Sequence, residues 1–167
     1  MDKNKFTLPG ILLLLLVLSP FQVFASDEPA PVFELPTDNG KITLDSLKGK
    51  VVYLDFWASW CGPCRKSFPW MNRMIQRYRD KGLVIVAVNL DKSRDLAQKF
   101  LQDYPAQFTI AYDPEGNIAE AYDVQGMPSS YLIDRRQHIV KVHLGFKDED
   151  TLGLERNIEY LLESTRD

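Results

Sequence analysis

The feature that most limits how this chain can fold is a run of apolar and β-branched residues that leads to a pair of cysteines. The run, residues 51–57, is made of β-branched, aromatic and aliphatic residues except at Asp55 and contains no Gly or Pro, which predicts a strand buried on both faces. Cys61 and Cys64 follow after a short turn. Beyond them, apolar side chains recur at helical spacing, at Phe68, Met71, Ile75 and Tyr78. A buried strand followed by an amphipathic helix predicts an α/β fold, in which helices pack on a sheet.

The rest of the chain continues the alternation of strands and helices. Strands are predicted at 33–35 and 42–44 (a hairpin), 83–89, 108–112, and 129–133 with 138–144 (a second hairpin). Helices are predicted from the capping residue Ser93 to Tyr104, at 117–122 and at 148–164. The expected fold class is therefore α/β, with a mixed central sheet flanked by helices and an N-terminal β-hairpin.

The N-terminal residues have the pattern of an export signal. Lys3 and Lys5 precede the apolar run 11–18, and small residues precede a cut after Ala25. The run is shorter than the roughly 20 residues of a membrane span, which favours a cleaved signal peptide at 1–25. An uncleaved anchor in the inner membrane is the alternative, because residues 6–25 carry no charge.

Both interpretations place the rest of the chain outside the cytoplasm, in the bacterial periplasm. We expect a linker at 26–31 and one domain at 32–167. The chain has 20 basic and 23 acidic residues and no basic block, so we expect no nucleic acid partner. A monomer is expected.

The chain has two cysteines, and their spacing separates three uses. A bridge from Cys61 to Cys64 closes a loop too short to remove much entropy from the unfolded chain, which disfavours a structural disulfide. A zinc site needs two more ligands, yet His138 and His143 are five apart on a predicted strand and point to opposite faces. We therefore expect no metal, and a redox pair remains.

Residues 55–64, Asp-Phe-Trp-Ala-Ser-Trp-Cys-Gly-Pro-Cys, closely resemble the active-site segment of thioredoxin. Over about 31–162 the chain resembles the TlpA/ResA-type exported thioredoxin-like proteins. The segments that carry this resemblance are Leu-Lys-Gly-Lys-Val-Val at 47–52, Cys-Arg-Lys-Ser-Phe-Pro at 64–69, and Gly-Met-Pro at 126–128 before a strand ending in Leu-Ile-Asp.

The resemblance implies a thioredoxin fold with an inserted helix and strand between residues 91 and 112. It implies that Pro128 follows a cis peptide bond and lies against the cysteine pair. It also implies dithiol–disulfide exchange that uses no cofactor.

Disulfide exchange requires a thiolate, because the neutral thiol is a poor nucleophile. Cys61 is predicted at a helix N-terminus, where free N–H groups and the helix dipole favour an anion. Its thiol pKa should therefore fall below the ordinary value of about 8.5. Cys64, predicted one turn inside the helix and buried, is the resolving thiol that attacks the mixed disulfide and releases the client protein.

Resolution requires Cys64 to lose a proton in an apolar site. Asp55 stands in an otherwise apolar run, where thioredoxins keep a buried carboxylate behind the cysteines, and we expect it to accept that proton. The candidate catalytic residues are Cys61, Cys64, Asp55 and Pro128.

Relatives dedicated to cytochrome c maturation usually have a glutamate three residues after the second cysteine, and Asn in place of the strand Asp. This chain has Ser67 and Asp55 at these positions, which favours a more general reductase.

Client binding is expected at the rim of the cysteine turn. Trp60, Gly62 and Pro63 lie beside the cysteines in the sequence. The cis bond implied at Pro128 turns the backbone of Met127 toward an incoming chain, which can pair as an added strand. Core packing alone explains Trp57.

Several functions use paired cysteines. The Gly-Pro dipeptide resembles the reducing members of the family, which favours a reductase of client disulfides that a membrane electron donor keeps reduced. A disulfide oxidase or isomerase is the alternative in the same class. A peroxiredoxin-type peroxidase is less favoured, because its Pro-x-x-x-(Thr/Ser)-x-x-Cys pattern does not precede Cys61. A copper-chaperone binding module is less favoured because those relatives use Cys-x-x-x-Cys with a distal His.

Overall fold

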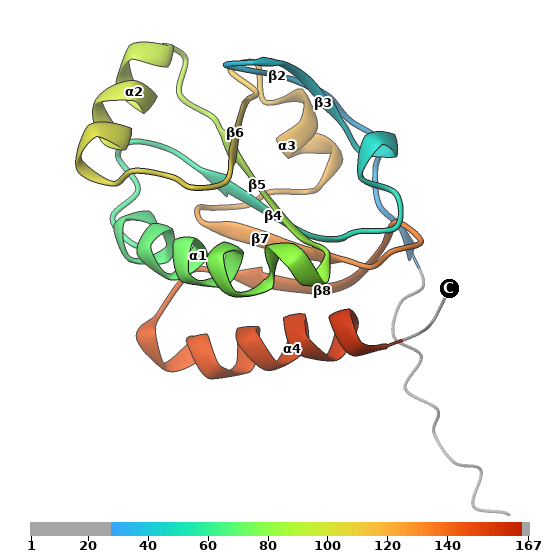
Figure 1. The fold of residues 1–167 in the computed structure, drawn as a ribbon. Helices are drawn as coiled ribbons and strands as arrows, with labels where there is room; N and C mark the ends of the chain where they lie inside the picture. The colour runs from blue at the N-terminus through green and yellow to red at the C-terminus, as the bar shows by residue number, and fades with distance from the viewer. Residues whose placement is uncertain (1–27, 165–167) are drawn as a thin grey trace, which may run out of the picture.

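The computed structural model describes residues 28–164, which form one eight-stranded sheet with helices on both faces (Figure 1). The strand order is β1-β8-β7-β4-β5-β6-β2-β3. The strands are β1 Glu28–Pro29, β2 Glu34–Thr37, β3 Gly40–Thr43, β4 Val51–Trp57, β5 Leu83–Asn89, β6 Thr109–Tyr112, β7 Ser129–Ile133 and β8 His138–Leu144. The α-helices are α1 Cys64–Tyr78, α2 Arg94–Asp103, α3 Asn117–Ala121 and α4 Thr151–Glu163; the 3-10 turns are η1 Asp45–Leu47, η2 Arg79–Lys81 and η3 Asp148–Asp150.

β4 is central to the sheet, and all of its side chains are buried. It pairs in parallel with β5 and antiparallel with β7. Because successive side chains of a strand point to opposite faces, β4 contributes to two cores. Tyr53 and Trp57 pack in one buried cluster, and Leu54 and Phe56 pack in the other.

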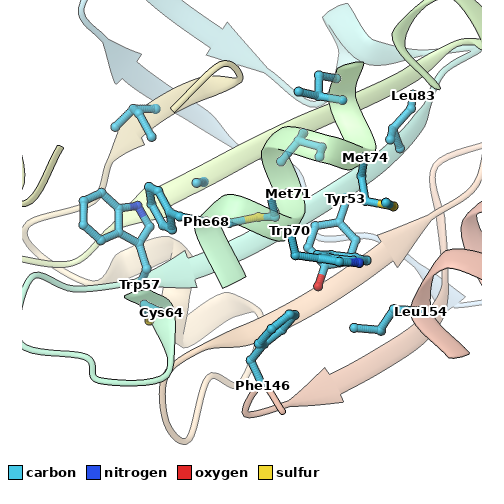
Figure 2. Packing of buried hydrophobic residues seen from close by; sticks show 14 of the residues in the cluster. Tyr53, Trp57, Cys64, Phe68, Trp70, Met71, Met74, Leu83, Phe146 and Leu154 are labelled. Atoms are coloured by element: carbon cyan, nitrogen blue, oxygen red, sulfur yellow. The ribbon is translucent and has the colours of Figure 1, made fainter. Parts of the chain in front are cut away.

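The first of these clusters lies under α1 and contains both cysteines. Figure 2 shows Phe68, Trp70 and Met71 of α1 lying among the side chains that rise from β4. The Trp57 and Phe68 rings meet edge to face with centroids 4.8 Å apart, an arrangement that aromatic pairs favour. Side chains of α2 and α4 join the same cluster, whereas α3 packs in the cluster on the opposite face.

The predicted strands at 51–57, 83–89, 129–133 and 138–144 have the bounds that the structure shows, and the N-terminal hairpin is present as antiparallel β2 and β3. Ser93 caps α2, as predicted, by accepting a hydrogen bond from the Asp95 N–H at 3.3 Å. Local patterning was sufficient in these places because each element is bounded by its own turn or capping residues.

The linker predicted at 26–31 is wrong where the structure describes it. Glu28 and Pro29 form β1, which pairs antiparallel with β8, and Ala30 is buried with its N–H donating to the Gln137 carbonyl at 2.8 Å. Because proline is tolerated in an edge strand, a proline in the sequence does not by itself indicate a linker. The predicted signal peptide at 1–25 lies outside the described residues. Among residues 28–164, no helix is both long enough and apolar enough to cross a membrane.

Candidate active site

Cys61 and Cys64 lie in the turn between β4 and α1 and form a disulfide, with Cα atoms 5.4 Å apart. The helix begins at Cys64, with Pro63 as its N-cap. Cys64 is therefore the first helical residue, and the prediction that it lies one turn inside the helix is wrong. Pro63 explains the difference, because it has no N–H to place inside a helix and its φ of −63° suits a helix start.

The N-terminus of α1 faces the sulfur of Cys61. The Cys64 N–H donates to Cys61 Sγ at 3.2 Å, so one of the free N–H groups of the first helical turn points at the atom expected to carry the negative charge. Within residues 28–164 this is the only hydrogen-bond donor to that sulfur. In the disulfide form Cys64 is fully buried, as predicted, and Cys61 is 3% exposed.

The two tryptophans beside the cysteines separate into core and rim. Trp57 is fully buried, whereas Trp60 is 69% exposed and presents a large apolar ring at the surface next to Cys61. Two grooves adjoin this turn. One, of about 430 Å³, includes Gly62, Pro63, Lys66 and Phe146, and the other, of about 320 Å³, includes Ser59, Arg65, Leu96 and Lys99.

Asp55 lies on the face of β4 that carries Tyr53 and Trp57, and so on the side of the sheet where the cysteines pack. Its side chain is completely buried. Burial raises the pKa of the Asp55 carboxyl from 3.8 to about 7, because the charged form is poorly solvated there; a hydrogen bond from Ser130 offsets part of this rise. Oδ1 accepts that bond at 2.7 Å, and Oδ2 has no partner within the described chain.

The Met127–Pro128 peptide bond is cis, as the resemblance implied. Pro128 comes directly before β7, whose first residue Ser129 pairs with Phe56. This register places Pro128 at the same end of the sheet as Trp57 and the cysteine turn. Met127 is half-buried and packs against the cluster that contains both cysteines.

Sequence reasoning missed a carboxylate that braces the cysteine turn. Asp91, just after β5, accepts hydrogen bonds at Oδ2 from the Ser59 N–H at 2.8 Å and at Oδ1 from the Ser59 hydroxyl at 2.9 Å. The side-chain amide of Asn89 donates to Oδ2 at 2.7 Å. The signal available was the Asn-Leu-Asp sequence that ends a buried strand next to β4, because polar groups at the carboxyl ends of parallel strands gather at one edge.

Sequence reasoning also missed Ser130, the partner of Asp55. Ser129 and Ser130 are adjacent, and only the pairing of β7 with β4 shows which of them faces the carboxyl. Ser67, where some relatives have a glutamate, is buried, and its hydroxyl donates to the Cys64 carbonyl at 3.2 Å.

A sheet of this topology with a Cys-x-x-Cys disulfide where its central strand meets a helix defines a thioredoxin-fold thiol–disulfide oxidoreductase. The AhpC/TSA family model matches residues 27–142 of this chain, so the chain belongs to that family. The predicted fold class and the predicted family resemblance are both confirmed by the comparisons that follow.

Among known proteins, the chain is 37% identical over 161 residues to the thiol-disulfide oxidoreductase ResA of Bacillus subtilis, with 90% of each chain covered. It is also 37% identical over 156 residues to the thioredoxin-like protein YneN of the same organism, covering 84% of this chain and 91% of that one. A solved structure assigned as the thiol:disulfide interchange protein DsbE of Chlorobium tepidum has 51% identity and a TM-score of 0.80, covering 81% of this chain and 96% of that one.

Proposed function

We propose that this protein is a periplasmic reductase of protein disulfides, in which Cys61 attacks the client, Cys64 resolves the mixed disulfide and Asp55 receives the Cys64 proton. Its clients are proteins that carry disulfides, and a membrane electron donor returns it to the dithiol form. The observation that carries the reducing direction is the sparse stabilisation of Cys61. Gly62 and Pro63 bring no charged or polar side chain to its sulfur, and the Cys64 N–H is the only hydrogen-bond donor to it in the described chain.

The direction follows because a stabilised thiolate favours the dithiol form and makes the disulfide an oxidant. Where only one backbone N–H supports the thiolate, the dithiol gains less and gives up its electrons more readily. We therefore expect a reduction potential nearer thioredoxin's, about −270 mV, than the roughly −120 mV of a strong oxidant.

The reaction conserves electrons and protons. The Cys61 thiolate attacks one sulfur of the client disulfide, and the other sulfur leaves as a thiolate. Asp55 Oδ2 takes the proton of Cys64, whose thiolate attacks Cys61 Sγ and expels the second client sulfur. Two electrons have then passed to the client, the protein holds the Cys61–Cys64 disulfide, and Asp55 is neutral. The membrane donor returns two electrons to the disulfide, Asp55 returns its proton to Cys64, and Cys61 is a thiolate again.

A pKa of about 7 suits Asp55 for this exchange, because a group that titrates near the working pH both accepts and returns a proton readily. Asp55 Oδ2, buried and without a partner in residues 28–164, is the oxygen available for it. The export signal at 1–25, or an uncleaved anchor there, supports a periplasmic location, and the domain is proposed to act as a monomer. Trp60, Gly62, Pro63 and Met127 are proposed to contact the client, with Pro128 shaping the backbone beside them.

Two experiments test the direction of electron flow. The first traps cells with acid and separates the dithiol and disulfide forms of Cys61 and Cys64 by gel shift. A mostly reduced pair supports the reductase. A mostly oxidised pair with a potential above about −180 mV would establish an oxidase or isomerase instead. That alternative is favoured by a solved Bacteroides thetaiotaomicron structure, assigned as a protein disulfide isomerase, with 29% identity and a TM-score of 0.76.

The second experiment adds a charge next to Cys61. A Cβ at Gly62 has no atom within 4 Å, so a side chain fits there. Gly62→Arg should raise the potential by about 30 mV relative to the uncharged control Gly62→Gln, because stabilising the thiolate by ~1.4 kcal/mol corresponds to that shift. Equal potentials in the two variants would show that the dipeptide does not set the direction.

The roles of the two cysteines are tested by alkylation. In the reduced protein, iodoacetamide should label Cys61 before Cys64, because Cys64 is the more deeply buried of the two. Cys61→Ser should abolish reduction of insulin disulfides, and Cys64→Ser should trap mixed disulfides with clients. A Cys64 that reacts first would reverse the assignment. The peroxidase alternative lacks its motif, since Leu54 and Ala58 occupy its proline and hydroxyl positions and both are fully buried.

A further inference from the structure

Two adjacent serines follow Pro128, and their hydroxyls donate hydrogen bonds to different acceptors. Both are buried at the start of β7. Ser129 donates to the Gly126 carbonyl at 2.6 Å, within its own loop. Ser130 pairs with Asp55 in the register of β7 and β4, and its hydroxyl donates to Asp55 Oδ1 at 2.7 Å. Of the two serines, only Ser130 therefore contacts Asp55, the candidate proton acceptor.

The Ser130 hydroxyl fixes which carboxyl oxygen is available. It is the only hydrogen-bond donor to the Asp55 side chain within residues 28–164, and it engages Oδ1. Oδ2 is left buried and unpartnered on the face that β4 turns toward the cysteine cluster. A carboxyl held at one oxygen loses rotational freedom, so the open oxygen keeps a constant orientation.

We propose that Ser130 is a positioning residue for disulfide exchange, which holds Asp55 by Oδ1 and leaves Oδ2 to take the proton of Cys64. This inference rests on the proposed role of Asp55. A hydroxyl that donates to a carboxylate also favours its charged form, which opposes the effect of burial. Removing the hydroxyl should raise the pKa of Asp55 further and leave less carboxylate to accept a proton at neutral pH.

Other titratable groups near Asp55 and Ser130 lie on the elements that pack against them. Tyr53, on the same face of β4, has a buried hydroxyl; burial and the nearby Asp55 raise its pKa, and the nearby Ser130 hydroxyl lowers it. Cys61 and Cys64 approach from the α1 side. His143 on β8 pairs with Ser130, and its Nε2 lies 3.4 Å from Asp150 Oδ2. On β5, the residue paired with Asp55 is Ala87, which does not titrate.

The experiment compares Ser130→Ala with Ser129→Ala, an adjacent buried serine whose hydroxyl does not touch Asp55. Ser130→Thr retains the hydroxyl and should rescue the effect, and His143→Gln controls for titration on β8. The first readout is the protonation midpoint of Asp55, from carboxyl NMR or from the infrared difference against Asp55→Asn. The second is the pH profile of insulin-disulfide reduction.

We expect Ser130→Ala to raise the Asp55 midpoint by about one pH unit, the size of one hydrogen bond to a charged group. Turnover should fall up to about tenfold at pH 6 and recover by pH 9, because the carboxylate is the accepting form. Ser129→Ala, Ser130→Thr and His143→Gln should keep the wild-type midpoint. In the Asp55→Asn background, Ser130→Ala should have no further effect on the profile.

Two failures can be told apart. An Asp55 midpoint that is the same in Ser130→Ala and Ser129→Ala would overturn the positioning role of Ser130 and leave that of Asp55 standing. A midpoint that rises while the turnover profile stays fixed would overturn the role of Asp55 as proton acceptor, and the role of Ser130 with it.

Discussion

Two buried carboxylates flank the cysteine turn, and the protein surrounds them differently. Asp91 is 6% exposed and accepts three hydrogen bonds, from the Ser59 N–H, the Ser59 hydroxyl and the Asn89 amide. Asp55 is completely buried and accepts one, from Ser130. A carboxylate with both oxygens occupied holds neighbouring backbone in place. A carboxylate in an apolar site with one oxygen that accepts no hydrogen bond is costly to keep charged, so it takes up a proton more readily.

A third buried carboxylate, that of Asp113, resembles Asp91 because both of its oxygens accept hydrogen bonds. Its oxygens accept the N–H groups of Asn117, Ile118 and Ala119 at 2.9 to 3.1 Å, and so cap the first turn of α3. Burial alone therefore does not mark a functional carboxylate in this protein. The number of hydrogen-bond donors at its oxygens separates the bracing carboxylates from the candidate proton acceptor.

The largest expected effect is the pH dependence of stability at Asp55. Its pKa rises from 3.8 to about 7 on folding, so the folded state holds the proton more tightly than the unfolded state. The stability this supplies is fully present below pH 3.8 and is lost as the pH rises through about 7, a change of ~4 kcal/mol.

Asp55→Asn should remove this dependence. Urea unfolding of the disulfide form from pH 4 to pH 8 should show the wild type losing about 4 kcal/mol relative to the variant. If the difference in unfolding free energy between the two proteins stays constant over this range, Asp55 ionises as readily in the folded protein as in the unfolded one. The contrast drawn between Asp55 and Asp91 would then be wrong.

Asp91→Ala should destabilise the protein by about 3 kcal/mol, because the buried amide of Asn89 and both Ser59 donors lose their acceptor. The free energy of unfolding at pH 7 measures this, and Asp91→Asn, which keeps one acceptor oxygen, should lose less. A loss below that of Asp55→Asn under the same conditions would reverse the roles given to the two carboxylates.

Asp113→Ala should cost about 2 kcal/mol, the upper range for loss of a helix N-cap. Since α3 packs on the opposite face of the sheet from the cysteine cluster, insulin reduction at pH 7 should keep its wild-type rate. Thermal unfolding and turnover measured on the same sample separate the two effects. A large fall in turnover by the folded variant would contradict a purely bracing role.

Ser59→Ala should have the smallest effect, about 1 kcal/mol, because it removes one hydroxyl and leaves the Ser59 N–H bonded to Asp91. Urea unfolding of Ser59→Ala and Asp91→Ala, alone and combined, measures how much of the brace acts through that hydroxyl. Losses that simply add in the double variant would show that the two side chains do not act together.

The sequence by itself determined the elements and the chemistry they carry. The apolar run 51–57 gave β4 with its bounds, and the cysteine spacing with Gly62 and Pro63 identified a redox pair. Asp55 stood out as the one charged residue in a buried strand. These features are local: hydrophobic period, turn residues and short spacings are written in contiguous residues.

Tertiary structure decided which groups surround those residues. Ser130 reaches Asp55, and Asp91 reaches Ser59, through contacts between residues 75 and 32 positions apart in the chain. The pairing of Glu28 and Pro29 with β8 is likewise distant in sequence. Alternation along a strand shows which residues share a face, but the register between strands comes from packing of the whole core. A shift of β7 by one residue would turn Ser129 toward Asp55 in place of Ser130, and only the folded sheet fixes that choice.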